Sequence, residues 1–171
     1  MSAHKSDIFD ARRFDADLIA VTPEGNRNAH PQARALALFR SALRAGRAAL
    51  KQKFFDGEPA QDIIGLHAWL VDQLLARAWN MHQQLASGCG KLALAAVGGY
   101  GRGELYPASD VDLLLLTEKT SPARLREFVQ PLLSFLWDMG LEVGHSVRTL
   151  KDCVRESRKD ITVATNLMEA R

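Results

Sequence analysis

The sequence predicts an α+β fold in which an N-terminal helical hairpin packs on a small mixed β-sheet. Apolar residues recur at helical spacing between residues 31 and 85 of the 171-residue chain. After residue 90 the pattern changes to short apolar runs of strand length, separated by a glycine-rich turn and then by a second helical pattern. Strands that alternate with helices in this way form a sheet covered by helices.

Three segments follow from this pattern. Residues 1–29 are polar and are interrupted by Pro23 and Gly25, so we expect a loosely ordered lead-in. Residues 30–90 form the expected helical hairpin, and residues 91–171 form the expected sheet-containing core.

The first helix of the hairpin is expected from Pro31, a favourable first-turn residue, to about Phe54. Gly46 falls inside it at some cost in helix propensity. The buried stripe at helical spacing is expected to contain Leu36, Phe39, Leu43, Leu50 and Phe54.

The same helix carries a basic face, formed by Arg40, Arg44, Arg47 and Lys51. One interpretation is a solvated face whose long side-chain stems cover apolar surface. The other is a contact surface for an acidic partner, a nucleotide or another domain.

The second helix is expected from about Pro59 to Leu85, where Ser87, Gly88 and Gly90 follow and end it. Its predicted stripe contains Ile63, Leu66, Leu70, Leu74, Met81 and Leu85.

The predicted core contains three strands and the helices between and after them. Residues 91–97 and 110–118 read as two strands on either side of a turn that can hold a helical turn. A helix is expected over 121–139, where Gly140 ends it, a third strand over 141–150, and helix again from Lys151. The chain ends at Arg171 within a helix-forming stretch, so we expect a fragment of a longer protein.

The composition excludes several classes of protein. The 22 basic residues nearly balance the 20 acidic ones, so nonspecific binding of nucleic acid is not indicated. Cys89 and Cys153 are far apart, which suggests neither a disulfide framework nor a cysteine zinc site. No apolar run approaches the roughly 20 residues of a membrane span. We therefore expect a cytoplasmic protein whose partners include neither nucleic acid nor a membrane.

Two aspartates, Asp110 and Asp112, stand at the start of the second predicted strand. Because side chains alternate along a strand, both carboxylates point to one face, about 7 Å apart. Two like charges at this distance repel each other unless a cation lies between them. The apolar residues that follow are expected to be buried on both faces, so the pair is well placed to bind a hard divalent cation such as Mg²⁺.

The glycine-rich turn before these aspartates has the properties of an anion cradle. Gly98, Gly99, Gly101 and Gly103 allow positive φ angles and a close approach of the backbone to a ligand. Arg102 adds a donor that suits phosphate. The turn lacks the lysine and hydroxyl residue of a P-loop and the spacing of a dinucleotide-binding fingerprint. A glycine turn next to carboxylates is therefore typical of a nucleoside triphosphate site.

The pattern of Gly98 and Gly99, ten residues, and then Asp110, an apolar residue and Asp112 resembles the signature of the nucleotidyltransferase superfamily that includes DNA polymerase β. The longer string GGYGRGELYPASDVDLLLL, with LEVGHSVRTL and TVATNLMEAR, resembles the family of bifunctional uridylyltransferase/uridylyl-removing enzymes that act on the nitrogen regulatory protein PII. The resemblance implies that residues 91–171 are a nucleotidyltransferase core.

The resemblance also implies a mechanism. Asp110 and Asp112 would be catalytic and would hold Mg²⁺, UTP would be the donor, and a PII tyrosine would be the acceptor. The implied nucleotide-binding residues are Gly98, Gly99, Arg102 and Ser109. The family's HD domain, which would carry the uridylyl-removing activity, and its ACT domains are expected beyond residue 171.

Many superfamily members add a third carboxylate from a later strand, and this sequence offers only two candidates. These are Glu142 and Glu169, and for each a solvated or ion-paired glutamate is the simpler interpretation. If neither joins, metal binding depends on the two aspartates and the nucleotide, and the empty site should have low affinity for the metal.

Two alternatives remain open from the sequence. One is a different nucleotidyltransferase with the same two-metal chemistry, such as an adenylyltransferase. The other is a non-catalytic nucleotide-sensing module of the same fold.

Overall fold

Three strands form the sheet at the centre of the computed structural model, which describes residues 5–21, 31–87, 89–118 and 122–171. They are β1 (Leu92–Ala96), β2 (Val111–Thr117) and β3 (Val143–Arg148), in the order β1-β2-β3. β1 runs antiparallel to β2, with Ala96 opposite Leu113, whereas β3 runs parallel to β2, with Asp112 opposite Gly144. The predicted α+β class with a mixed sheet is confirmed.

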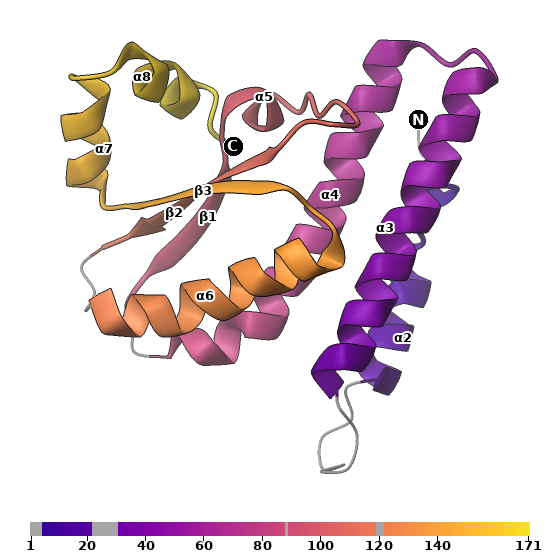
Figure 1. Ribbon diagram of the computed structural model, residues 1–171, viewed down its shortest axis with the longest axis horizontal. Coiled ribbons are helices and arrows are strands. Elements are labelled where there is room, and N and C mark those ends of the chain that lie inside the picture. The colour runs from indigo at the N-terminus through magenta and orange to yellow at the C-terminus, as the bar shows by residue number, and fades with distance from the viewer. Residues whose placement is uncertain (1–4, 22–30, 88, 119–121) are drawn as a thin grey trace.

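Helices lie on both faces of this sheet (Figure 1). The hairpin helices and α6 lie on one face, and α7 and α8 lie on the other. Their bounds are α2 Ala11–Val21, α3 Pro31–Phe55, α4 Ala60–His82, the 3₁₀ turn η1 Gln83–Ala86, α5 Gly98–Gly101, α6 Pro122–Met139, α7 Leu150–Ser157 and α8 Ile161–Met168.

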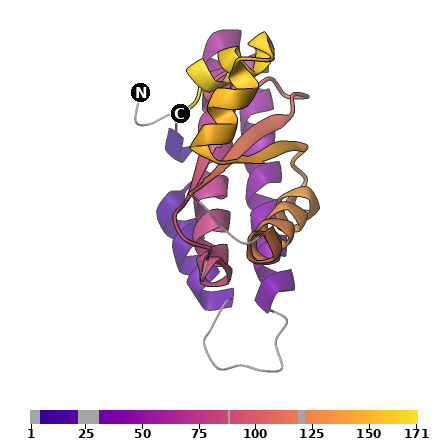
Figure 2. The ribbon, with the colours of Figure 1, turned by 90° about the vertical axis from the view of Figure 1, so that its left-hand side faces the viewer.

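The predicted hairpin is confirmed by α3 and α4, which run side by side in opposite directions (Figures 1 and 2). Gly46 of α3 packs directly against Leu70 of α4. A β-carbon at Gly46 would lie 2.5 Å from Cδ2 of Leu70, which is fully buried. The glycine that is unfavourable for helix propensity is therefore explained by helix packing.

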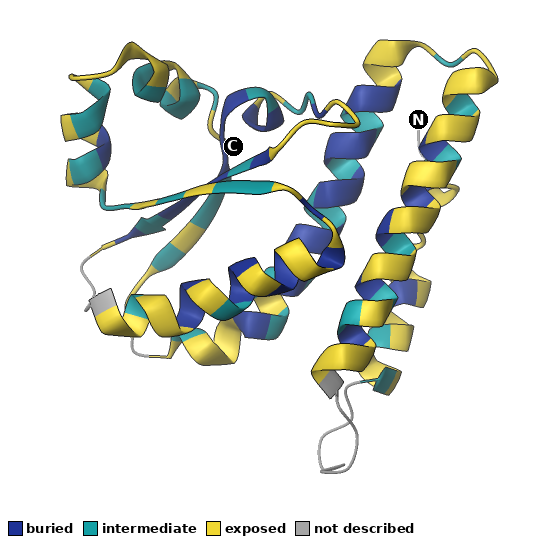
Figure 3. Ribbon diagram, viewed as in Figure 1, coloured by how far each residue is buried: buried dark blue, intermediate teal, exposed yellow. Residues whose placement is uncertain are grey.

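The main core lies between the hairpin, α6 and one face of the sheet. Side chains alternate along β2, so Val111, Leu113 and Leu115 enter this core. Leu114 instead joins a smaller cluster on the opposite face with Val97 and Cys153. Figure 3 shows the consequence: much of α4 is buried, whereas α7 and α8 are mostly exposed or half-buried.

The expectation of a loosely ordered lead-in over 1–29 is wrong for residues 5–21, and residues 1–4 and 22–29 lie outside the described part. Helix α2 occupies residues 11–21, and its Phe14 ring lies 5.0 Å from the Phe39 ring, edge to face. Three apolar side chains of this segment, Ile8, Phe9 and Phe14, are buried. The polar composition of the segment gave no sign of these residues, because only a few of its side chains are buried.

Two residues of the predicted stripes are exposed instead. Phe54 is 53% exposed and Leu85 is 45% exposed, whereas Phe39, Leu43, Leu70 and Leu74 are buried as predicted. Phe54 lies in the last turn of α3, and Leu85 lies in η1, because α4 ends at His82 and the helical repeat predicted to Leu85 stops there.

The basic face of α3 is partly used within the fold. The Arg40 guanidinium donates to the Asp138 carbonyl, and Arg47 donates to the Gly140 carbonyl at 3.4 Å. These carbonyls lie at the C-terminal end of α6, where the helix dipole favours positive charge.

Within the described residues, no helix combines the length and hydropathy that a bilayer crossing requires.

Alanine substitutions at the two helical glycines Gly46 and Gly65 are predicted to have opposite effects on the free energy of unfolding. Gly46→Ala should destabilise the fold by about 1–3 kcal/mol, because its methyl group would overpack against Leu70. Gly65→Ala is the matched control, since nothing lies within 4 Å of its β-carbon position and alanine favours helix by about 1 kcal/mol. Denaturant unfolding of both variants measures the effect. Equal stabilisation by the two alanines would contradict the close packing at Gly46.

Candidate functional site

Asp112 lies half-buried at the start of β2, on the face that carries α8. Its neighbour on β3 is Gly144, and a β-carbon there would lie 2.6 Å from Asp112 Oδ1. A β-carbon at position 144 would force the carboxylate to move from this position. The parallel pairing of β2 and β3 thereby fixes where the Asp112 side chain can lie.

Gly98 borders the other oxygen of the same carboxylate. It follows β1 after Val97 and has φ +61°, a left-handed conformation that favours glycine. A β-carbon at Gly98 would lie 3.2 Å from Asp112 Oδ2. The Val97 N–H donates to the Asp112 carbonyl at 3.0 Å, so the glycine turn is attached directly to the aspartate strand.

The glycine turn folds as the single helical turn α5. Its first backbone bond runs from the Gly101 N–H to the Val97 carbonyl at 3.0 Å. The N–H groups of Gly98, Gly99 and Tyr100 precede that bond, and so they have no acceptor within the helix. They are backbone donors beside a pair of carboxylates.

Tyr100 anchors this turn to the hairpin. Its hydroxyl donates to Asp72 Oδ1 of α4 at 2.6 Å, and Arg171 donates to Asp72 Oδ2 at 2.7 Å. The Arg171 guanidinium also lies over the Tyr100 ring, 5.2 Å from its centroid. Burial, and then the Asp72 charge, raise the pKa of Tyr100 far above its usual range, so the hydroxyl remains a hydrogen-bond donor.

Arg102 follows the turn and is held between two glutamates. Its Nε donates to Glu104 Oε2 at 3.1 Å, and its Nη1 lies 2.7 Å from Glu169 Oε2. Its Nη2 folds back over the turn, 3.5 Å from the β-carbon position of Gly99. The hydrogen bond to Glu104 and then that to Glu169 raise the pKa of Arg102. A guanidinium has five N–H donors, so this side chain keeps donors for a further anion.

The aspartate pair carries uncompensated negative charge. Desolvation, and then the charge of Asp110, raise the pKa of Asp112, while Asp110 itself is exposed. Neither carboxylate makes a hydrogen bond or ion pair to any residue that the structure describes. Two unpaired hard oxygen donors that repel each other fit a divalent cation.

Both candidates for a third carboxylate lie near arginines. Glu169 pairs with Arg102. Desolvation lowers the pKa of Arg47, and the charge of Glu142 opposes this by raising it. In the described parts of the chain, no three His, Cys, Asp or Glu side chains gather closely enough to hold a metal. A third ligand from Glu142 or Glu169 therefore stays a prediction.

Ser109 is exposed in the loop that leads into Asp110. Its backbone N–H donates to the Tyr106 carbonyl at 3.1 Å, which closes a turn just before the aspartates. Its role as a phosphate contact stays a prediction.

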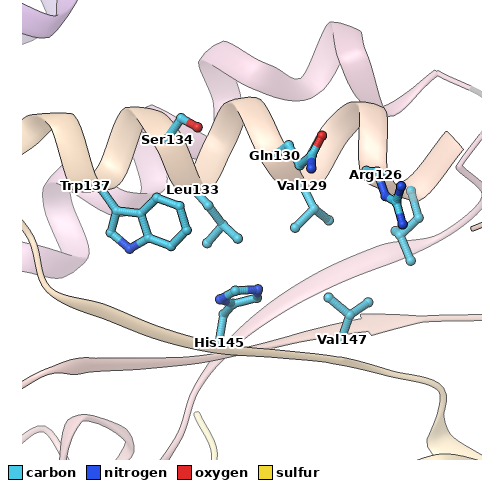
Figure 4. A pocket seen from close by; sticks show the side chains of 9 residues that line it. Arg126, Val129, Gln130, Leu133, Ser134, Trp137, His145 and Val147 are labelled. Atoms are coloured by element: carbon cyan, nitrogen blue, oxygen red, sulfur yellow. The ribbon is translucent and has the colours of Figure 1, made fainter. Parts of the chain in front are cut away.

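A separate groove lies on the opposite face of the sheet, between α6 and β3 (Figure 4). It has a volume of about 560 Å³, and Trp137, His145 and Val147 are among its lining residues. His145 and Val147 alternate with Gly144 along β3, so they face away from Asp112. The groove and the aspartate site are therefore independent features.

Two further residues of the site were not singled out by the sequence. Gly144 is placed beside Asp112 by strand pairing, and Asn166 is placed near Gly98 by the return of α8 to the turn. Their partners lie at least 32 residues away in the sequence, so no local spacing pattern points to either residue.

Comparison with known proteins assigns the region around the aspartates to a family. The family described as "Putative nucleotidyltransferase DUF294" matches residues 45–146, which include the glycine turn, both aspartates and Gly144.

Three relatives carry the name bifunctional uridylyltransferase/uridylyl-removing enzyme. The chain is 48% identical to that of Nitrosococcus oceani over 136 residues, which is 80% of this chain and 15% of the relative. It is 42% identical over 165 residues to those of Pseudomonas syringae pv. syringae and Azotobacter vinelandii, which is 96% of this chain and 17% of each relative. The chain thus spans about one sixth of the length of these curated relatives.

The raised pKa of Asp112 predicts a substitution that stabilises the fold. The folded state binds the Asp112 proton more tightly than the unfolded state does, so stability falls as the pH rises through this pKa. Asp112→Asn removes the charge and should raise the free energy of unfolding at pH 7 by less than about 1 kcal/mol, because solvent screens a half-buried group. The gain should disappear below about pH 4, where the wild-type carboxyl is protonated.

Unfolding in millimolar Mg²⁺ should narrow the difference in stability between wild type and Asp112→Asn, because the cation stabilises only proteins that keep the Asp112 carboxylate. Asp138→Asn is the control, since Asp138 is exposed on α6. Equal Mg²⁺ effects on all three proteins would argue against a cation site at Asp112.

Proposed function

This chain belongs to the nucleotidyltransferase family that matches its residues 45–146, and from that premise we propose that it carries out Mg²⁺-dependent nucleotidyl transfer. The donor is UTP, the acceptor is a tyrosine hydroxyl of the nitrogen regulatory protein PII, and pyrophosphate is released. The reaction serves nitrogen-status signalling. The observation that carries the proposal is the unpaired Asp110 and Asp112 pair beside the Gly98 turn.

Two kinds of support favour uridylyl transfer over other nucleotidyl transfers. The relatives named above are uridylyltransferases by name, at 42–48% identity. In addition, their similarity extends over up to 96% of this chain, so it includes the hairpin and α7–α8 as well as the family region.

Mg²⁺ suits the aspartate pair because carboxylate oxygens are the ligands it prefers. Asp110 and Asp112 would hold it, and Glu142 or Glu169 would be the source of any third carboxylate. When bound, Mg²⁺ neutralises phosphate charge and lowers the pKa of an attacking hydroxyl. Gly144 leaves the space in which the Asp112 carboxylate takes its position.

The remaining residues bind and orient the nucleotide. Gly98 and Gly99 present backbone N–H groups without side chains that would block a phosphate. Arg102 donates to the triphosphate from the N–H groups that Glu104 and Glu169 leave free. Ser109 adds a hydroxyl beside Asp110. The Tyr100–Asp72 hydrogen bond keeps the turn in place while pyrophosphate departs.

The proposed partners follow from the same relatives. PII is the protein substrate, and the uridylyl-removing activity in the relatives' name belongs to parts of those proteins that this chain does not match, where we place the HD and ACT domains. No His-Asp dipeptide occurs in this chain. The proposal includes a cytoplasmic location, with which the free thiols of Cys89 and Cys153 are compatible.

Incubation of the protein that carries this chain with labelled UTP, Mg²⁺ and PII tests the proposal. Wild type should label PII on tyrosine, and Asp110→Asn or Asp112→Asn should lower the rate by more than about a hundredfold, since changes merely next to metal ligands already cost ten- to a hundredfold. Asp138→Asn should label PII at the wild-type rate.

Two results would contradict the proposal. Undiminished labelling by the Asp110→Asn, Asp112→Asn double variant would exclude these two aspartates as the catalytic residues. Efficient use of ATP without any use of UTP would exclude the uridylyl donor and favour an adenylyltransferase.

A further inference from the structure

We propose that Asn166, on α8, binds the triphosphate of the nucleotide by donating a hydrogen bond from its carboxamide to a non-bridging oxygen of the β- or γ-phosphate. The inference rests on the proposed function, and it adds a residue from a different element to the site.

The position of Asn166 is defined by Gly98. A β-carbon at Gly98 would lie 3.6 Å from Asn166 Oδ1 and 3.2 Å from Asp112 Oδ2. The amide and the carboxylate therefore border one small space next to the backbone of the glycine turn. A ligand held by the turn and by Asp112 would come within reach of Asn166.

The carboxamide is available for such a ligand. Asn166 is half-buried, and it makes no hydrogen bond to any residue in the described ranges. A partly buried amide that leaves both N–H groups unpaired forgoes stabilisation that a polar partner would supply. A phosphate oxygen is such a partner.

The contacts around Asn166 hold it in place. The backbone of Arg171 pairs with that of Ala96 through two hydrogen bonds of 3.0 and 3.1 Å, so the segment after α8 lies along β1. Gly101 packs directly against the Glu169 carbonyl, where no side chain would fit. Next to Asn166 in the chain, Leu167 packs on the small cluster that contains Leu114.

The chemistry explains why an amide suits this position. Asp110 and Asp112 already repel each other, so a third carboxylate here would add like charge and would also repel the triphosphate. An asparagine is neutral and can present its donor group to a phosphate oxygen. A hydrogen bond to a charged group contributes about 1.5–3 kcal/mol, which corresponds to at least about tenfold in affinity.

The test is the equilibrium binding of UTP and of UMP, each with Mg²⁺, to the protein that carries this chain. Asn166→Ala should weaken UTP binding about tenfold and UMP binding less than about twofold, because UMP lacks the β- and γ-phosphates. Thr165→Ala is the matched control, since Thr165 is the exposed neighbour on α8 and its hydroxyl bonds only to carbonyls of the same helix. It should bind both nucleotides like wild type.

Asn166→Asp separates a hydrogen bond from packing, because it preserves the size of the side chain. It should weaken UTP binding at least as much as Asn166→Ala does, since a carboxylate loses the donor and repels the phosphates. Wild-type UTP affinity in either variant, or equal losses for UTP and UMP, would overturn the proposed contact.

The two proposals fail in different ways. A wild-type protein that neither binds UTP nor labels PII would overturn the proposed function and the Asn166 contact together. A wild type that does both, with an Asn166→Ala variant of equal UTP affinity, would overturn the contact alone.

Discussion

The repulsion between Asp110 and Asp112 is the constraint on which the rest of the structure depends. Two carboxylates without partners would turn away from each other on a mobile loop, but here Asp112 belongs to a strand that is packed on both faces, and Asp110 directly precedes that strand. Val111, Leu113 and Leu115 are buried in the main core, and Leu114 is buried on the other face. A strand held on both faces cannot rotate to carry Asp112 away from Asp110, so packing keeps the two like charges near each other. Under the proposed function, a bound cation would relieve this repulsion, and the stability of the fold would then be linked to binding at the site.

The helical hairpin contributes to the site through one polar connection. Asp72 of α4 accepts hydrogen bonds from the Tyr100 hydroxyl and from Arg171, so α4, the glycine turn and the segment after α8 meet at a single carboxylate. Each partner limits the movement of the others, because Arg171 also donates to the Tyr100 carbonyl at 3.2 Å. The turn would otherwise be the most flexible part of the chain, given its four glycines. The hairpin thereby orders the backbone donors before a nucleotide arrives, which lowers the entropy lost on binding.

The sequence was informative where the structure depends on local periodicity. The apolar run of the second strand predicted the buried Leu113, Leu114 and Leu115, and helical spacing identified α3, α4 and α6. Prediction failed for Phe54, in the last turn of α3, and for Leu85, because α4 ends at His82 and a 3₁₀ turn with a different repeat follows. It also missed the buried side chains of residues 5–21. Gly144 and Asn166 could not be predicted, since strand register and the return of α8 determine their neighbours, and neither is encoded in local spacing.

The charges around the site explain why metal and nucleotide should bind together. Mg²⁺ requires about six oxygen ligands, and two aspartates supply only part of that set. Glu169 does not complete it in this arrangement, because its carboxylate neutralises Arg102. Under the proposed function, triphosphate oxygens would supply the missing ligands, and Arg102 and the turn would bind the same phosphates. Under the proposed function, the site should therefore bind the metal alone and the nucleotide alone only weakly, because each supplies the charge that the other needs.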